Sequence, residues 1–560
     1  MKKIILFIVL FCISYLSKSQ NNEIEKCITR FQYNKALDLC KSKYSNTTES
    51  AVLLQLGQLY NKINLPDSAL IFLNKIEIAE QNYLYWSEKL ISYSLLENTT
   101  EAKTMFDKLF SASFNTKKAP IILKAIEVFS LKKVNKFQYA SDLLTRIQES
   151  ESTNANYYLL NANYLLNTNK IGEAVTELER AVFYDSINPL PFYLLGKIYY
   201  QSRNYALSLE SFNKSISKDS LFYPSYKELG NIYYDLNKNQ KSLEYFKIYC
   251  DNNVISQFDS LKLASMFLLN KQYAEAENIN NKIFSANPKN IFSLRLNAYI
   301  NYENDKNISD GLKSIETLFS IADSSQIITS DYEYRGKLYS KSKQDSIAIV
   351  NFNLALHKDS THIANFELIA KSYESLKNNV KAAEYYQESI NHKEKAMPSD
   401  YFFMGRNYYI AASKPVDSLL RANSEKFLID SNLRIQYLIK ADTAFGSVIS
   451  LSSNSHLGYM WKARVQAMYD PETTQGLALP LYLKTLSIID QKPEKYKKEI
   501  IESSKYVGYY YYLQFESFQK LNNKEKSDEM KNESIKYWNK IITIEPEDKT
   551  ALEAVKKLNK

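Results

Sequence analysis

Glycine is scarce in this sequence. Only 11 of its 560 residues are glycine, and the two closest, Gly446 and Gly458, lie twelve positions apart. This spacing excludes both glycine-rich phosphate-binding loops, G-x-G-x-x-G and G-x-x-x-x-G-K-[ST]. The nucleophile-elbow motif G-x-S-x-G and the zinc motif H-E-x-x-H are absent as well. We therefore expect a non-enzymatic protein with no catalytic residue and no cofactor.

Histidine and cysteine are also few. The four histidines are scattered along the chain: His357, His362, His392 and His456. Since neither a cysteine nor a carboxylate completes a zinc set around them, we expect no metal site. Beyond the leading segment only Cys27, Cys40 and Cys250 remain, too few for a disulfide framework. Cys27 and Cys40 could meet across a first helical hairpin, and both a disulfide and two buried free thiols stay open.

The chain lacks a strong charge of either sign. Its 71 lysines and arginines against 62 acidic residues leave a formal net charge of +9. Basic residues gather only in short runs such as Lys117–Lys118 and Lys497–Lys498. Nucleic acid is therefore not expected as a partner.

Long hydrophobic runs are missing except at the start. Two lysines precede a thirteen-residue apolar run from Ile4 to Leu16, and small polar residues follow it. Thirteen residues extend roughly 20 Å as a helix, short of the ~30 Å hydrocarbon core, so a signal peptide fits better than a membrane anchor. Lipid attachment at Cys12 is disfavoured because the bulky Phe11 precedes it. We expect residues 1–19 to be removed and the protein to be exported to the periplasm or the outer membrane.

Aromatic residues are abundant, with 45 tyrosines and 27 phenylalanines, and this composition favours helices. The decisive signal is an internal repeat, in which small residues recur every 34 positions. They are Ala162, Gly196, Gly230, Ala264 and Ala298, followed by a second pair with the same spacing, Gly336 and Ala370.

Bulky residues accompany each small residue at fixed distances. Around Gly336 the set is Tyr332, Tyr339, Ala348, Phe352 and Ala355. This arrangement resembles the tetratricopeptide repeat, a helix–turn–helix unit with the pattern W-x2-L-G-x2-Y, then A-x3-F, then P. Position 8 of the unit lies where its two helices cross most closely, so only hydrogen or methyl fits there. Six glycines occupy position 8: Gly57, Gly196, Gly230, Gly336, Gly405 and Gly508.

The resemblance implies an all-α fold, a right-handed superhelical solenoid of about 13 helical hairpins. The predicted units start near residues 50, 83, 118, 155, 189, 223, 257, 291, 329, 363, 398, 456 and 501. We divide the chain into a signal peptide (1–19), a degenerate N-terminal hairpin (20–49), a solenoid (50–397) and a C-terminal region with insertions (398–560). The insertions, at about 411–434 and in the last unit, are expected to lengthen helices or loops, or to form a functional arm.

The resemblance also implies a binding surface on the inner face of the solenoid, formed by positions 2, 5, 9 and 12 of each first helix. The residues at matching positions that we take as a partner-binding groove are Tyr193, Lys197, Tyr200, Lys227, Asn231, Tyr234, Lys337, Arg406, Tyr409, Tyr509 and Tyr512. Further matching positions hold Glu333, Glu367, Lys371 and Phe402. Tyrosines beside lysine, arginine and asparagine suit an extended peptide or an acidic segment, although tyrosines this numerous could also simply decorate the surface.

One known recognition mode of the family is not implied. The family's clamp for acidic C-terminal peptides needs five basic or amide residues over three units, and Lys227 with Asn231 supplies two of them. Lys262 stands where the clamp needs asparagine, and Phe292 with Leu296 replaces its basic pair. The clamp is therefore broken.

The leading hypothesis is a non-catalytic scaffold in the cell envelope that binds a protein or peptide partner through its concave face. The alternative is a carbohydrate-binding outer-membrane protein resembling the starch-uptake lipoproteins, whose helical cores also contain tetratricopeptide hairpins. Those proteins carry a lipid-anchor cysteine that this sequence lacks. An uncharted hydrolase is the third and weakest hypothesis, and the oligomeric state is left open.

Overall fold

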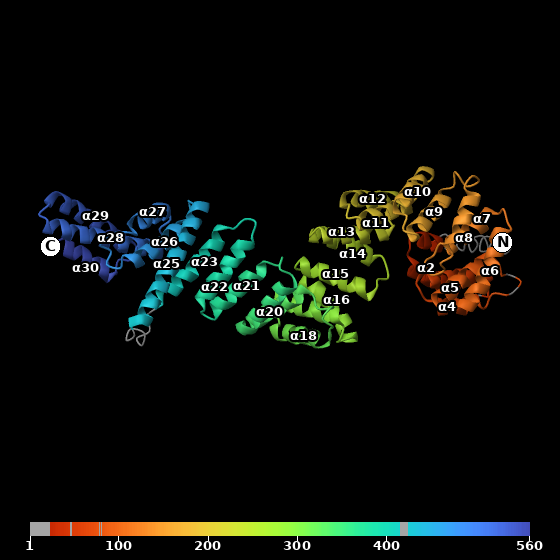
Figure 1. Ribbon diagram of the computed structural model, residues 1–560, viewed down its shortest axis with the longest axis horizontal. Coiled ribbons are helices and arrows are strands. Elements are labelled where there is room, and N and C mark those ends of the chain that lie inside the picture. Colours follow the sequence, from red (N-terminus) through yellow and green to blue (C-terminus); the bar gives the residue numbers. More distant parts are fainter. Residues whose placement is uncertain (1–22, 45–47, 78, 80, 415–423) are drawn as a thin grey trace, which may run out of the picture. The chain divides into compact units, whose positions relative to one another are not determined.

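The structure, a computed structural model, describes residues 23–44, 48–77, 79, 81–414 and 424–560 (Figure 1). The predicted signal peptide and its cleavage site lie outside these residues. Among the residues described, no helix combines the length and apolar character needed to cross a membrane. The chain packs as two compact units, the first ending at Asn287 and the second beginning at Pro288.

The first unit contains a helical segment at 23–29 and fifteen labelled helices. They are α2 (Tyr33–Lys43), α3 (Ser50–Lys62), α4 (Pro66–Leu73), α5 (Tyr83–Leu95), α6 (Thr99–Phe114), α7 (Ala119–Phe129), α8 (Phe137–Ile147), α9 (Ala155–Asn167), α10 (Ile171–Tyr184), α11 (Pro189–Gln201), α12 (Tyr205–Lys218), α13 (Tyr223–Asp235), α14 (Asn239–Asp251), α15 (Gln257–Leu269) and α16 (Tyr273–Ala286).

The second unit is helical in the same way. Its helices are α17 (Ile291–Glu303), α18 (Ile308–Ile321), α19 (Thr329–Lys341), α20 (Asp345–Lys358), α21 (Ala364–Ser375), α22 (Asn379–His392), α23 (Pro398–Ser413), α25 (Ser424–Leu451), α26 (His456–Tyr469), α27 (Leu479–Ile489), α28 (Lys497–Lys520), α29 (Lys524–Ile544) and α30 (Lys549–Leu558).

Consecutive helices pair into hairpins, and within each unit neighbouring hairpins pack against one another. From α3 with α4 to α28 with α29 the described helices form thirteen such pairs. First helices also contact the first helices of neighbouring hairpins, as α3 does with α5 and α11 with α13. The prediction of an all-α solenoid of about thirteen hairpins is confirmed.

The turn inside each hairpin explains how a chain so poor in glycine can change direction. In most of the turns that the structure describes, one residue has a positive φ near 60°, which favours glycine, yet the residues found there are mostly asparagine, lysine and other polar types. In nine hairpins it falls at position 15 of the repeat: Asn64, Glu97, Asn169, Arg203, Asn237, Lys271, Asp305, Lys343 and Lys377. Six of the eleven glycines lie at the helix crossing instead, and Gly476, with φ 69°, is the one glycine of the described residues in a turn of this kind.

At the crossing, each position-8 glycine lies against a bulky side chain of the second helix. A Cβ on Gly196 or Gly336 would come within 2.7 Å of the ring of Phe212 or Phe352. The serine at position 20 then bonds across the contact, as when Ser208 Oγ donates to the Gly196 carbonyl at 2.8 Å. An equivalent hydrogen bond joins the Ser242 hydroxyl to the Gly230 carbonyl and the Ser534 hydroxyl to the Gly508 carbonyl. Because glycine has no side chain, the hydroxyl can reach the backbone of the first helix.

The insertions lengthen helices. Most first and second helices have 13 or 14 residues, whereas α25 has 28, α28 has 24 and α29 has 21. Residues 415–423 of the first insertion lie outside the described residues, and residues 424–434 begin α25.

We expect Gly230→Ala to lower the free energy of unfolding by about 1–3 kcal/mol, although alanine is the better helix former. Its Cβ would lie 2.8 Å from Phe246 Cβ and 3.0 Å from the Phe246 backbone nitrogen, which cannot move aside as a side chain can. The matched control is Gly172→Ala in α10, where the added Cβ meets nothing within 4 Å and should raise stability by up to about 1 kcal/mol. Urea denaturation followed by circular dichroism measures both, and equal shifts would show that the crossing is not packed as described.

Candidate functional site

The first helices of successive hairpins form one continuous surface in each unit, which we call the first-helix face. In the first unit, α11 and α13 carry six of the predicted groove residues. Tyr193 is half-buried, Lys197 is exposed with its Nζ 5.7 Å from the Tyr193 ring centre, and Tyr200 donates its hydroxyl to Asp235 at 2.6 Å. Tyr234 is 39% exposed. Tyr199, which precedes Tyr200 on α11, is partly buried.

The cations of this surface already have partners within the chain. Lys227 Nζ lies 2.7 Å from Asp259, which is almost fully buried. Asn231 accepts from Lys262 at 2.7 Å and donates to Glu228 at 2.9 Å. The two residues that fit the family's acidic-peptide clamp are therefore engaged in contacts between neighbouring hairpins.

The predicted groove residues of the second unit show the same pairing. Lys337 lies 2.5 Å from Glu333 on its own helix. Arg406 Nη2 contacts Glu374 at 2.8 Å. Tyr409 packs edge-on against Trp461 with ring centres 5.5 Å apart.

Tyr509 and Tyr512, on α28, stack with ring centres 6.4 Å apart. The Tyr512 hydroxyl bonds to Glu516 and to Lys557. These residues lie in the C-terminal hairpins and do not line the cleft described next.

A cleft of about 640 Å³ opens on the first-helix face of the first unit. Its lining is aromatic and polar: Phe31, Gln32, Tyr33, Asn34, Lys35, Asp38, Ile63, Tyr193, Pro224, Lys227, Tyr249, Asp251, Asn252, Asn253 and Val254. Of the predicted groove residues it takes in Tyr193 and Lys227. One wall comes from the N-terminal hairpin and the other from α11, α13 and the end of α14.

The N-terminal hairpin reaches across this cleft. Arg30 contacts the Asp219 carboxylate with two nitrogens, Nε at 2.7 Å and Nη2 at 3.1 Å. The ring of Phe31 packs against Tyr193 and Phe222 with centres 6.3 and 5.6 Å away. Because Tyr193 and Phe222 also touch, at 5.4 Å, the three rings form a cluster. Burial, with a smaller effect of Glu228, raises the pKa of Tyr193.

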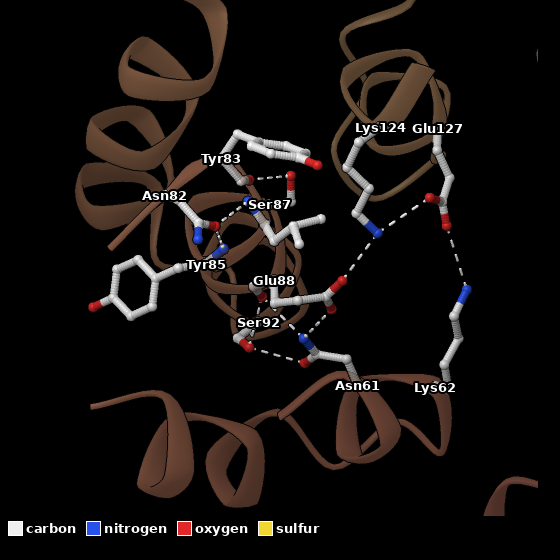
Figure 2. Close-up of polar contacts among 11 residues, drawn as sticks. Asn61, Lys62, Asn82, Tyr83, Tyr85, Ser87, Glu88, Ser92, Lys124 and Glu127 are labelled. Carbon is white, nitrogen blue, oxygen red and sulfur yellow. Dashed lines mark hydrogen bonds and ion pairs between the residues drawn. The ribbon is translucent and has the colours of Figure 1, made fainter. Parts of the chain in front are cut away.

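A second polar cluster lies on the first helices nearer the N-terminus (Figure 2). The Glu88 carboxylate, on α5, accepts from Lys124 of α7 at 3.1 Å and from Asn61 of α3 at 3.1 Å. Lys124 also contacts Glu127 at 3.1 Å, and Glu127 lies 3.6 Å from Lys62. Three successive hairpins are thus joined by one charged network.

Electrostatics holds Lys124 and Glu127 in their ionised forms. Burial lowers the pKa of Lys124, but the Glu88 and Glu127 carboxylates outweigh it, so the pKa is raised. Burial raises the pKa of Glu127, but the Lys124 and Lys62 ammonium groups outweigh the effect of burial. The pKa of Glu127 is therefore lowered. Burial and the Glu127 charge raise the pKa of Tyr33 to about 12.

The cysteines Cys27, Cys40 and Cys250 are free and buried. Burial raises the pKa of Cys40 to about 11 and that of Cys250 to about 12, so both stay protonated at neutral pH. Across the described part of the chain, histidine, cysteine and carboxylate side chains do not gather in threes that could hold a metal ion.

Several site residues escaped the sequence analysis. Arg30, Phe31 and Asp219 belong to turns, whereas the repeat pattern directs attention to helix positions. One signal was present: Phe31 stands in the turn of the degenerate hairpin, where an aromatic residue is unusual for this sequence.

We expect Lys124→Met to lower the free energy of unfolding by about 3–5 kcal/mol, because it leaves the Glu88 carboxylate buried without its cation. Adding Glu88→Gln should recover much of that loss, since the charge then disappears. The control is Lys214→Met, in the exposed α12 pair with Glu210 at 2.7 Å, which should change stability by no more than about 0.5 kcal/mol. Urea denaturation measures all three, and similar shifts for the two lysines would contradict the buried-network description.

Comparison with known proteins finds neither a matching family model nor a matching curated protein. Among solved structures, the C-terminal part of a TPR repeat-containing protein from Cytophaga hutchinsonii is 27% identical, covers 53% of this chain and 99% of its own, and superimposes with a TM-score of 0.41. A tetratricopeptide repeat protein from Parabacteroides merdae is 14% identical, covers 45% of this chain and 98% of its own, with a TM-score of 0.35. These likenesses are shallow. The 34-residue frame, the thirteen hairpins of the described residues and the tight crossings at position 8 show a fold built from tetratricopeptide-type hairpins.

Proposed function

We propose that this chain is a non-catalytic scaffold of the cell envelope that binds a protein or peptide segment on the first-helix face of its first unit. The observation that carries the proposal is the cleft between the N-terminal hairpin and α11, α13 and α14. Its volume, about 640 Å³, is in the range of binding pockets, and it lies open along the repeat array.

The chemistry of the cleft supports a peptide ligand. Tyr33, Tyr193 and Tyr249 offer flat apolar contact, and the side-chain amide oxygens of Asn252 and Asn253 add hydrogen-bond acceptors to the lining. Because the charge of Lys227 is offset by Asp259, an acidic ligand would have to displace that carboxylate. Aromatic contact therefore contributes more than charge attraction to Lys227.

The envelope location rests on the leading sequence. The lysines and apolar run before Ser19 have the layout of a signal peptide. Mass measurement on protein from its native envelope tests this part: a chain that begins at Gln20 supports it, and one that retains residues 1–19 overturns it.

The binding proposal is tested by photo-crosslinking from two exposed aromatic positions. Benzoylphenylalanine in place of Tyr234, on the first-helix face, should form adducts with a protein in native cells. The control is the same group in place of Phe183, which is 80% exposed at the end of the second helix α10 and should give few adducts.

Adding Lys197→Ala to the chain that carries the probe at position 234 should reduce the yield of crosslinked adducts several-fold. The substitution removes an exposed side chain beside the cleft and leaves the hydrophobic core unchanged. Equal yields at the two probe positions would contradict the proposed surface. Retention of the purified chain on an oligosaccharide resin, with no protein adduct, would favour the carbohydrate-binding alternative.

A further inference from the structure

A short turn of the N-terminal hairpin, residues 30–32, contacts hairpins that lie far along the chain. We call this turn the clasp. Arg30 pairs with Asp219, which is 189 residues away, and Gln32 Nε2 donates to the Asn252 carbonyl at 3.3 Å, 220 residues away. Each hairpin otherwise packs mainly on its neighbours, so the clasp is an exception to nearest-neighbour contact within the first unit.

The centre of the clasp is an aromatic residue in an unusual conformation. Phe31 has φ 60°, a region that a bulky side chain adopts only when its surroundings hold it there. Its backbone bonds, Phe31 N to Ile28 O and Gln32 N to Cys27 O, repeat those around Asn64 and Leu65 in the next hairpin. Phe31 therefore stands at the turn position that is polar in nine other hairpins.

The clasp delivers that ring onto the surface predicted to bind a partner. The Phe31 ring packs on Tyr193 and Phe222, while Arg30 meets the Asp219 carboxylate beside them. The Arg30 and Asp219 side chains keep 24% and 21% of their exposure, so water can replace each partner once they separate. The ion pair is thus specific in chemistry and placed where it can open. Opening the whole clasp would also expose the Phe222 ring, which is fully buried while the clasp is closed.

We propose that the clasp occupies, within the same chain, the place of a partner segment. Asp219, Tyr193 and Phe222 then form a subsite for a basic residue followed by an aromatic residue in that segment. This inference rests on the proposed function and names the chemistry of the ligand. An aromatic–cationic ligand fits because the Asp219 carboxylate loses its cation when Arg30 leaves, whereas the nearby Lys227 is held by Asp259.

The clasp and a partner segment compete for the same subsite, and the clasp belongs to the same chain as that subsite. A clasp on the same chain acts at a high effective concentration, so a free peptide with the same residues binds weakly while the clasp is closed. Opening the clasp should therefore raise affinity for such a peptide without adding any contact to the subsite.

The test uses the full chain and a fluorescent peptide, ITRFQYNK, which copies residues 28–35. The clasp-open variant is Arg30→Ala with Phe31→Asn. Asparagine is chosen because Asn64, Asn169 and Asn237 hold the same positive φ, so the turn should survive. By fluorescence polarisation, we expect the clasp-open variant to bind the peptide at least tenfold more tightly than the natural chain.

Two controls define the subsite. Adding Asp219→Ala to the clasp-open variant should return binding to the level of the natural chain, and a peptide with glutamate in place of its arginine should not bind the clasp-open variant. A circular dichroism melt shows whether the variant is folded. If it is not, Arg30→Ala alone replaces it, with an expected gain of several-fold.

A folded clasp-open chain that binds the peptide no better than the natural chain would overturn the inference. So would binding that is unchanged by Asp219→Ala. Such a failure is separate from the scaffold proposal, since adducts formed from position 234 in native cells would still support a protein partner, and peptide binding without those adducts would support the subsite alone.

Discussion

In twelve of the thirteen hairpins the two helices approach so closely at position 8 that the residue there is glycine or alanine, and the α5–α6 hairpin, with the buried Leu90, is the exception. Six of the eleven glycines stand at this point, and at Gly230 the nearest atoms include the backbone of the opposite helix. With the crossing fixed, large residues such as Phe212 and Phe352 fill the space around it and are almost fully buried. Because each hairpin has the same crossing and the same large residues around it, successive hairpins present matching surfaces and stack in a similar way.

Charge pairs secure the joints between stacked hairpins. Asp331 is fully buried, and it accepts from Arg295 of the preceding hairpin, from the Tyr299 hydroxyl at 2.8 Å and from its own N-cap nitrogen at 2.9 Å. Lys227 with Asp259 repeats the arrangement between α13 and α15. These pairs align first helices, which is what makes their surface continuous, but they also engage the cations that a ligand would otherwise meet.

Much of the fold could be predicted from the sequence because a 34-residue period fixes helix, turn and crossing together. The thirteen hairpins and the packing of Gly196 follow from it directly. The binding surface was harder to predict. Tyr193 and Lys227 were placed correctly on first helices, yet their partners Phe31 and Asp259 depend on how hairpins stack. The contact between Arg30 and Asp219 could not be predicted from the sequence, because a repeat pattern describes neighbouring hairpins and carries no information about residues 189 positions apart.

The clasp also bears on how the first unit folds. An array of hairpins can form from any point and spread through local contacts, so its contact order is low and its folding fast. The clasp, by contrast, closes a loop of almost two hundred residues and cannot form until the intervening hairpins have set the curvature that brings Asp219 to Arg30. It is therefore the last contact to be made and among the first to be lost. Once closed, the clasp links the N-terminal hairpin to hairpins that lie far along the chain. A change in the packing of any hairpin between α2 and α13 therefore alters the contact between Arg30 and Asp219.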